Sequence, residues 1–186
     1  MTRSAWRRLS IVEERTISST RPWTGKRIAV RVDQIVRSDG HRTTREIVEH
    51  PGAAAILAWD GKRLAMVRQW RHATGQELLE IPAGTLEPGE PPAETARREL
   101  AEECGLAAAA WEAGPRFFTA PGFCTELMHL FLATDLTDAP GMADPDEQLE
   151  PSWMSLSDAV TAVDDGHITD AKTMVAVGWL ARRLAR

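Results

Sequence analysis

Cysteine is scarce in this chain, because only Cys104 and Cys124 occur among its 186 residues. Two cysteines make no disulfide framework, and neither has partner cysteines or histidines at a zinc-binding spacing. No run of basic residues occurs, and the net charge is −5. That charge argues against nucleic acid or an anionic membrane as the main partner. These absences favour a protein of the reducing cytoplasm.

Long hydrophobic runs are also missing. No stretch is long and apolar enough to span a membrane. Arg7 and Arg8 lie near the start, but residues 9–21 lack the apolar core of a secretion signal. We therefore expect neither a membrane segment nor an export signal. The length suits one domain, or one domain with a short extension.

The N-terminal part predicts a small antiparallel strand pair. Residues 1–21 are polar and weakly patterned, so we expect a loose tail that runs into a first strand. Residues 26–37 alternate between apolar and polar side chains, as a half-buried strand does. Ser38-Asp39-Gly40 is a hairpin turn signal, and residues 42–49 would pair back.

We therefore expect the chain to divide into residues 1–50, which hold the tail and the strand pair, and residues 51–186, which form the main domain. Within the main domain, strands are predicted at 53–59, 64–70, 77–81, 116–119, 127–134 and 150–155. Residues 107–110 are four alanines with little information, and we expect a linker there. Because strands mix with helical segments, with one helix expected on each side of a mixed sheet, the pattern indicates an α/β sandwich.

One stretch, Gly84–Leu106, has the strongest pattern in the chain. Glu90 follows Gly84 after five intervening residues, and seven more precede the run Arg-Glu-Leu-Ala-Glu-Glu-Cys-Gly-Leu at 98–106. Prolines 91 and 92 suit the first turn of a helix, and residues 93–104 are rich in helix formers. Gly105 stands where a left-handed C-terminal cap belongs.

On that helix, Glu99, Glu102 and Glu103 occupy positions i, i+3 and i+4, so their carboxylates share one face. Like charges so close together repel one another. A bound Mg²⁺ would offset the repulsion, because it is a hard cation that takes carboxylate and phosphate oxygens. Arg98 lies four residues before Glu102 and can orient its carboxylate. The spacing therefore points to a divalent metal site.

The pattern of Gly84–Leu106 resembles the Nudix box at every fixed position, and we call this stretch the box. Nudix proteins share an α/β/α sandwich with a mixed sheet. They hydrolyse a nucleoside diphosphate linked to another group, and they use divalent cations. The resemblance therefore implies metal-assisted hydrolysis with Mg²⁺ or Mn²⁺, in which cations neutralise phosphate charge and favour deprotonation of water.

Segments outside the box are similar to the ADP-ribose pyrophosphatases of that family. Pro121 lies 15 residues after Leu106, inside FFTAPGFCTE, and further similar segments are 45–53, 67–71 and 80–84. This implies hydrolysis of ADP-ribose to AMP and ribose 5-phosphate. A hydrolase of another nucleoside diphosphate sugar, such as GDP-mannose, is the alternative. A domain that senses ADP-ribose without hydrolysing it fits less well, because every box carboxylate is present.

The resemblance also implies roles for single residues. The metal ligands would be Glu99 and Glu103, with Glu102 as an additional ligand and the backbone carbonyl of Ala83 completing the shell. Arg71 would meet the pyrophosphate or the terminal ribose. Further substrate-binding residues would be Glu80, near the substrate or a second metal, and Glu126, on a ribose.

Two more implied features concern the N-terminal strands and an acidic loop. Family members form homodimers in which the N-terminal strands cross to the partner, where Arg45 and Glu46 could reach the neighbouring site. Residues 138–148 form a Pro-, Gly- and acid-rich loop. From it Glu147, or alternatively Asp146, would act as the general base.

Overall fold

The computed structural model describes residues 13–139 and 149–186, and the chain divides into two compact units. The first unit comprises residues 1–50 and 122–125, and the second comprises residues 51–121 and 126–186. The short segment 122–125 is thus separated from the rest of its unit by a long stretch of sequence. The chain consequently passes from one unit to the other three times.

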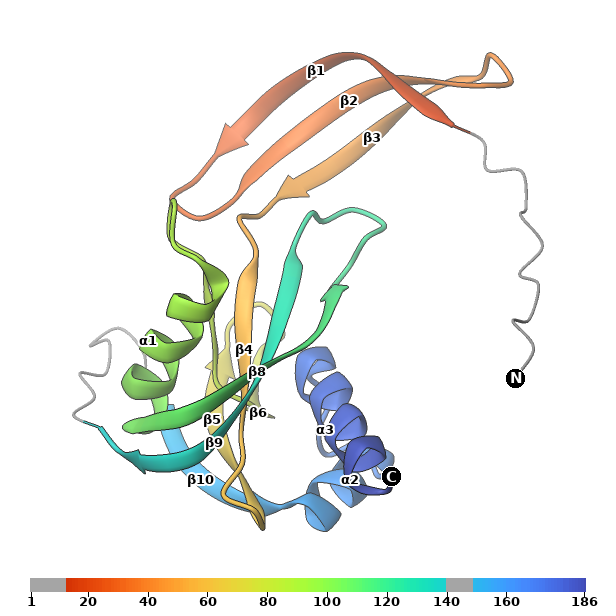
Figure 1. Cartoon of the computed structure of the whole chain (residues 1–186). Coiled ribbons are helices and arrows are strands. Elements are labelled where there is room, and N and C mark those ends of the chain that lie inside the picture. Colours follow the sequence, from red (N-terminus) through yellow and green to blue (C-terminus); the bar gives the residue numbers. More distant parts are fainter. Residues whose placement is uncertain (1–12, 140–148) are drawn as a thin grey trace. The chain divides into compact units, whose positions relative to one another are not determined.

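The first unit contains a three-stranded antiparallel sheet, drawn in red to orange in Figure 1. Its strands are β1 (Glu14–Thr24), β2 (Ala29–Arg37) and β3 (Arg42–Glu49), in the order β1-β2-β3. Strands β2 and β3 are the predicted pair. Strand β1 occupies much of the segment expected to be a loose tail. Every residue of β1 is exposed, and register shifts interrupt its pairing with β2, so it has no buried face that an alternating pattern could reveal.

The segment 122–125 joins this unit through the backbone of β3. The Val48 N–H donates to the Phe123 carbonyl at 2.7 Å, and the Thr125 N–H donates to the Val48 carbonyl at 3.0 Å. The Thr125 hydroxyl also accepts a hydrogen bond from the His50 N–H at 2.9 Å. These bonds satisfy backbone groups at the end of β3 that would otherwise need water.

The second unit has helices on both sides of its strands, as Figure 1 shows. One sheet has the order β7-β4-β9-β8 and the other has the order β10-β5-β6. The strands are β4 (Ala53–Ala58), β5 (Arg63–Arg71), β6 (Gln76–Glu80), β7 (Ala83–Thr85), β8 (Leu106–Phe118), β9 (Leu127–Asp138) and β10 (Leu149–Ser155). The helices are α1 (Pro92–Cys104), α2 (Leu156–Asp164) and α3 (Ala171–Leu184). Strands β4 and β9 are parallel and the other pairs are antiparallel, which confirms the predicted α/β sandwich with a mixed sheet.

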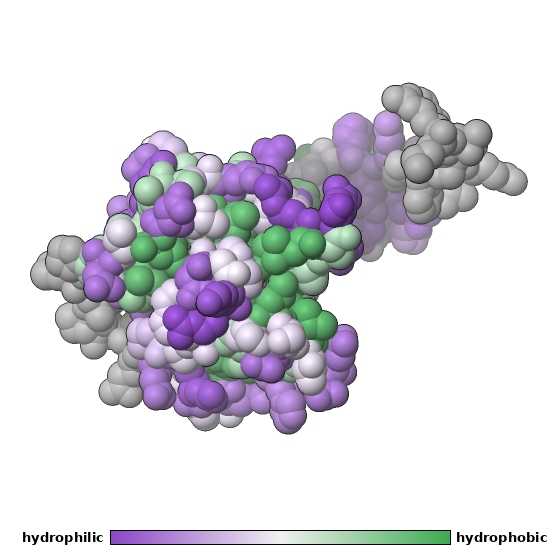
Figure 2. All heavy atoms as spheres, turned by 60° about the horizontal axis from the view of Figure 1, so that its bottom comes forward, coloured by the Kyte–Doolittle hydropathy of each residue, from purple (hydrophilic) through white to green (hydrophobic). Residues whose placement is uncertain are grey.

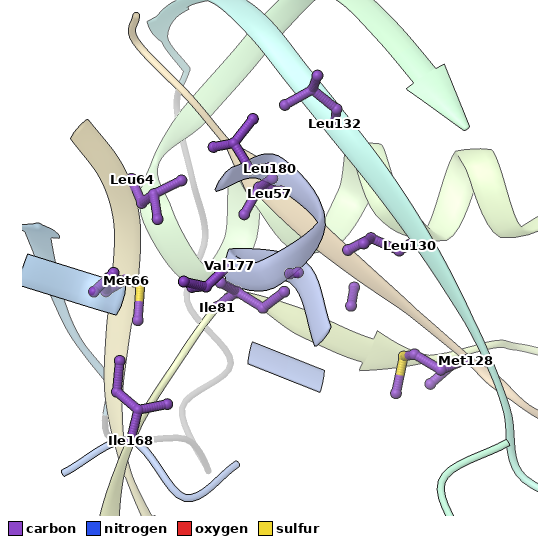
Figure 3. Packing of buried hydrophobic residues seen from close by; sticks show 14 residues of the cluster. Leu57, Leu64, Met66, Ile81, Met128, Leu130, Leu132, Ile168, Val177 and Leu180 are labelled. Atoms are coloured by element: carbon purple, nitrogen blue, oxygen red, sulfur yellow. The ribbon is translucent and has the colours of Figure 1, made fainter. Parts of the chain in front are cut away.

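Strand β4 is buried on both faces, which explains its unbroken apolar sequence. Alternate residues of β4 belong to two different core clusters. Leu57 packs in the cluster that contains Val177 and Leu180 of α3, as Figure 3 shows. Ile56 packs in the other cluster, with residues of α1 such as Leu100. The small alanines on the α1 face let that helix approach this strand closely.

Strand β8 begins earlier than the sequence indicated. The four alanines 107–110, expected to be a linker, are part of β8, with Ala107 opposite Thr137 and Ala108 opposite Leu136 of β9. Alanine has little strand propensity, so nothing local marks these residues as a strand. Pairing along the length of β9 overrides the local preference.

Helix α1 follows the predicted start and stop signals. Pro92 is its first residue, and Gly105 closes it in the left-handed conformation with φ 62°. Ala96 and Leu100 are fully buried against the sheet. This apolar stripe fixes the orientation of the helix. The charged residues of the box lie on its remaining faces.

Several large apolar side chains remain exposed on the second unit, namely Trp70, Phe118, Trp153, Met174 and Leu184. Figure 2 shows apolar areas, in green, between hydrophilic ones. In the part of the chain that the structure describes, none of the helices has the length and hydropathy that crossing a bilayer requires.

Candidate active site

Two glutamates of α1 converge on the backbone of the short strand β7. The Ala83 N–H donates to Oε2 of Glu103 at 3.0 Å. The carboxylate of Glu99 lies against Gly84, where an added β-carbon would be 1.8 Å from Oε1. Both side chains are buried, with 9% of Glu99 and 6% of Glu103 exposed. The glycine that opens the box is therefore required for the space that the Glu99 carboxylate fills.

Arg98 connects the remaining acidic residues of the box. Its Nε and Nη2 each lie 3.1 Å from an oxygen of Glu90. Its Nη1 donates to Glu99 at 2.6 Å and to Glu102 at 3.0 Å. One planar guanidinium thus binds Glu90 in a bidentate way and orients two further carboxylates on its own helix.

The pKa of Glu90 shows how strongly this arrangement favours its ionised form. Hydrogen bonds from Arg98 lower the pKa of Glu90 from its ordinary 4.5 to about 2, against the opposing effect of burial. The Thr95 hydroxyl donates to the same carboxylate at 2.8 Å. Arg98 in turn has a raised pKa, chiefly because of its hydrogen bonds to Glu90. The pair is charged throughout the physiological pH range.

The donors around β7 fit a hard divalent cation. Glu99 and Glu103 bring carboxylate oxygens to the same two backbone residues, and the Ala83 carbonyl belongs to that segment. Across residues 13–139 and 149–186, no three His, Cys, Asp or Glu side chains form a ready-made cluster. Glu99 and Glu102 both accept hydrogen bonds from Arg98. The three carboxylates and the Ala83 carbonyl are therefore the ligands that this part of the protein offers, and substrate oxygens would complete the shell.

A second group of charges joins Arg71, the last residue of β5, to Glu80, the last residue of β6, and to α3. Arg71 donates to Glu80 through Nε at 2.8 Å and through Nη2 at 2.6 Å. Lys172 of α3 donates to Oε2 of the same carboxylate. Only 1% of Glu80 is exposed. Burial raises the pKa of Glu80, but the hydrogen bonds from Arg71 and the charge of Lys172 outweigh it, so the net shift is downward.

Arg71 lies within electrostatic reach of the box. The charge of Glu103 is among the causes that raise the pKa of Arg71, after the Glu80 hydrogen bond and the opposing effect of burial. The side chain of Arg71 is 37% exposed, against 2% for Glu80. Arg71 is therefore a partly exposed cation whose charge interacts with that of Glu103.

The other predicted site residues have different surroundings. Glu126 accepts a hydrogen bond from the Thr119 hydroxyl at 2.6 Å, where the β8–β9 hairpin closes. Arg45 and Glu46 lie on β3 in the first unit, where Arg45 forms a bidentate ion pair with Glu14 of β1. Glu147 and Asp146 lie outside the described residues.

Sequence reasoning missed Lys172. A lysine in the first turn of a helix is disfavoured by the helix dipole, and Lys172 is the second residue of α3. An unfavourable charge at that position, two residues after an Asp170 that suits an N-cap, indicates that an acidic partner lies nearby. The signal was present, but it does not identify Glu80 as that partner, because 92 positions separate the two residues.

Comparison with known proteins places these residues in a family. Residues 48–176 match the family model of the NUDIX domain. The chain is 40% identical over 172 residues to "ADP-ribose pyrophosphatase" of Bacillus subtilis (strain 168), covering 91% of this chain and 93% of that relative. It is also 40% identical over 166 residues to "ADP-ribose pyrophosphatase" of Mycobacterium tuberculosis, covering 87% of this chain and 80% of that relative.

Two further comparisons extend this result. The chain is 37% identical over 173 residues to "Methanol dehydrogenase activator" of Bacillus methanolicus, covering 91% of this chain and 94% of that relative. A solved structure titled "Crystal structure of ADP compounds hydrolase" has a TM-score of 0.84, covers 95% of this chain and 97% of its own, and is 22% identical. At that identity the solved structure shows a shared fold.

Proposed function

Because the chain belongs to the NUDIX family, we propose that this hydrolase cleaves the pyrophosphate of ADP-ribose, releasing AMP and ribose 5-phosphate. The observation that carries the proposal is the convergence of the Glu99 and Glu103 carboxylates on the backbone of residues 83–84, with the Arg71 guanidinium nearby. Relatives over most of the chain are named ADP-ribose pyrophosphatases, which supports ADP-ribose as the substrate.

The residues divide into those that receive a cation and those that receive the substrate. Glu99, Glu103 and the Ala83 carbonyl would hold Mg²⁺ or Mn²⁺, and Glu102 would add a ligand on release from Arg98. Such a cation neutralises phosphate charge and makes the attacking water easier to deprotonate. Arg71 would bind the pyrophosphate, and Glu126, oriented by Thr119, would accept hydrogen bonds from a ribose hydroxyl.

The carboxylates of α1 are poor acceptors for the proton of the attacking water, because each already accepts a hydrogen bond. Glu99 and Glu102 accept hydrogen bonds from Arg98, and Glu103 accepts one from the Ala83 N–H. We assign the role of general base to Glu147, with Asp146 as the alternative, as the acidic loop suggested. The loop carboxylate would take the proton while the bridging P–O bond breaks and the leaving phosphate retains the bonding electrons.

Product analysis tests the proposal. Incubation with ADP-ribose and Mg²⁺ or Mn²⁺ should yield AMP and ribose 5-phosphate in equal amounts, and excess chelator should abolish the reaction. A panel with GDP-mannose at the same concentration examines the alternative substrate class. Preferential hydrolysis of GDP-mannose would show that ADP-ribose is not the preferred substrate. Undiminished activity in excess chelator would show that the reaction does not need a divalent cation.

The variant Glu103→Gln tests the role of this carboxylate as a metal ligand. Its amide oxygen can still accept the hydrogen bond from the Ala83 N–H, so the fold should survive. The loss of the negative charge should lower activity by about two orders of magnitude, since even outer-shell changes around a metal ligand cost 10- to 100-fold. Thermal unfolding of the variant close to that of the wild type would assign the loss to chemistry.

A further inference from the structure

The charges behind Arg71 form a chain that runs from solvent into the protein. Arg71 is partly exposed, Glu80 is almost fully buried, and Lys172 is buried with 7% of its surface exposed. Lys172 also lies 3.1 Å from Asp170, the N-cap residue of α3. Two cations therefore alternate with two carboxylates, and each of these four charges lies beside one of opposite sign.

The position of Lys172 is fixed by hydrogen bonds between α3 and the end of β6. Oδ2 of Asp170 accepts from both the N–H and the hydroxyl of Thr173, at 3.0 and 2.6 Å. The Thr173 hydroxyl oxygen accepts from the Ile81 N–H at 2.9 Å. Thr173 is fully buried. The first turn of α3 is thus attached to the residue that directly follows Glu80.

Both oxygens of Glu80 are already engaged. Arg71 contacts Oε1 and Oε2, and Lys172 contacts Oε2. A carboxylate in this state is poorly suited to take a metal or a ribose hydroxyl as well, because each new ligand must displace a buried ion pair. The contacts of Glu80 therefore suit it to hold the Arg71 guanidinium in place.

The guanidinium is held in one orientation. Nε and Nη2 point to Glu80, so the edge that carries Nη1 is the part left to meet an anion. A free arginine side chain has rotamer entropy that is lost when it is held against a ligand. Fixing it beforehand is a form of preorganisation. Without a second cation, a carboxylate as buried as Glu80 would be costly to keep ionised.

We propose that Lys172 is a positioning residue for substrate binding: through the buried Glu80 carboxylate, it keeps the Arg71 guanidinium aimed at the anionic pyrophosphate. This inference rests on the proposed function, because it takes a pyrophosphate as the ligand. Lys172 touches neither the substrate nor the reacting atoms, and it acts through Glu80 and Arg71 alone.

A double-mutant cycle separates positioning from general stabilisation. Lys172→Met keeps the linear stem and removes the charge, and it should lower kcat/KM for ADP-ribose by about 10- to 100-fold, the size of effect expected for a misplaced binding group. In an Arg71→Gln background, Lys172→Met should lower kcat/KM by less than about twofold, because the guanidinium that Lys172 is proposed to position is no longer present. Equal losses in both backgrounds would overturn the proposal.

Two further variants guard against a simple folding defect. Lys172→Met combined with Glu80→Gln leaves no uncompensated buried carboxylate, so thermal stability should recover while kcat/KM stays low, because Arg71 has lost its bidentate partner. Recovery of kcat/KM together with stability would contradict the assignment. Arg183 lies on the same helix as Lys172, and Arg183→Met breaks its exposed bidentate pair with Glu112 of β8. This control should leave kcat/KM unchanged in the wild-type and Arg71→Gln backgrounds.

The wild-type reaction is measured first, so that two kinds of failure can be told apart. A wild type that does not hydrolyse ADP-ribose overturns the proposed function, and this inference with it. An active wild type whose Lys172 and Arg71 effects are additive overturns only the positioning role of Lys172.

Discussion

The carboxylate of Glu99 occupies the space where a side chain at Gly84 would begin. An added β-carbon would lie 1.8 Å from Oε1, 1.9 Å from Cδ and 2.5 Å from Oε2 of Glu99. No contact of that length is tolerable, so the two positions cannot both carry side chains in this arrangement. The relationship links the first residue of the box to a residue on the helix that follows it.

Gly84→Ala should therefore impair the site more than the fold. The Glu99 carboxylate must move, and we expect kcat to fall by about 10- to 100-fold, as for other disturbances around a metal ligand. The free energy of unfolding should drop by about 1–3 kcal/mol from overpacking. Steady-state kinetics with a metal titration, together with urea unfolding, measures both effects.

Gly178→Ala is the matched control for this change. It adds the same methyl group within α3, where the nearest atom is the terminus of the flexible Arg182 side chain at 3.2 Å. Its activity should equal that of the wild type, and its stability should not fall, because alanine favours the helix over glycine. A Gly84→Ala enzyme with wild-type kcat and metal affinity would show that Glu99 is not needed where it lies.

Glu90 should make stability depend on pH in the acid range. Its pKa in the folded protein is lowered from 4.5 to about 2, chiefly by Arg98. The folded form therefore favours the ionised carboxylate, and its contribution is complete above pH 4.5 and is lost as the pH falls towards 2. The difference in unfolding free energy between the wild type and Glu90→Gln should be largest near pH 7 and should vanish near pH 2.

Glu94→Gln is the control for that titration, because Glu94 pairs with Arg97 on the same helix at 2.9 Å but is largely exposed. Its effect on urea unfolding should be small at every pH, as for most exposed ion pairs. If the unfolding free energies of Glu90→Gln and the wild type differ by the same amount from pH 7 to pH 2, the ion pair with Arg98 is not the origin of that difference.

The acidic loop provides a third prediction. Glu147→Gln should lower kcat by about 10²–10⁴-fold, as removal of a general base does, while KM and metal affinity change little. Asp146→Asn should be mild in comparison. If Asp146→Asn is the damaging change, the base is one residue earlier, and if neither lowers kcat tenfold, Glu102 becomes the better candidate.

Assembly provides a fourth prediction. In the first unit, the large side chains of Ile17 and Trp23 are 44% and 52% exposed on β1. A sheet with so few buried residues is marginal alone, and we expect a homodimer that covers it. Sedimentation at micromolar concentration should give twice the mass of the chain. A monomer would also remove the proposed roles of Arg45 and Glu46 at a neighbouring site.

The parts of this protein that sequence predicts are those whose causes are local. Helix α1 is marked by Pro92 and Gly105, and the apolar run of β4 marks a strand buried on both faces. The i, i+4 spacing that joins Arg98 to Glu102 is also a local property. Strand β1 is exposed along its whole length, and the alanines that open β8 have little strand propensity, so both depend on pairing with another strand and their own residues carry little preference.

The site shows the same division. The box and its carboxylates were recognisable because their spacing is fixed by one helix and one turn. The Lys172–Glu80 pair depends on where α3 packs against β6, and that contact is set by the core as a whole. A long-range ion pair between two buried residues therefore becomes visible only once the chain is folded.

The division of the first unit between two stretches of sequence limits how the chain can be shortened. Deleting residues 1–50 would leave segment 122–125 in place while removing Val48, its hydrogen-bond partner at both Phe123 and Thr125. A truncation intended to isolate the catalytic part would thus expose two backbone groups at an internal loop. Replacing 122–125 by a short polar turn in the same variant is the better design, because it removes both halves of the unit together.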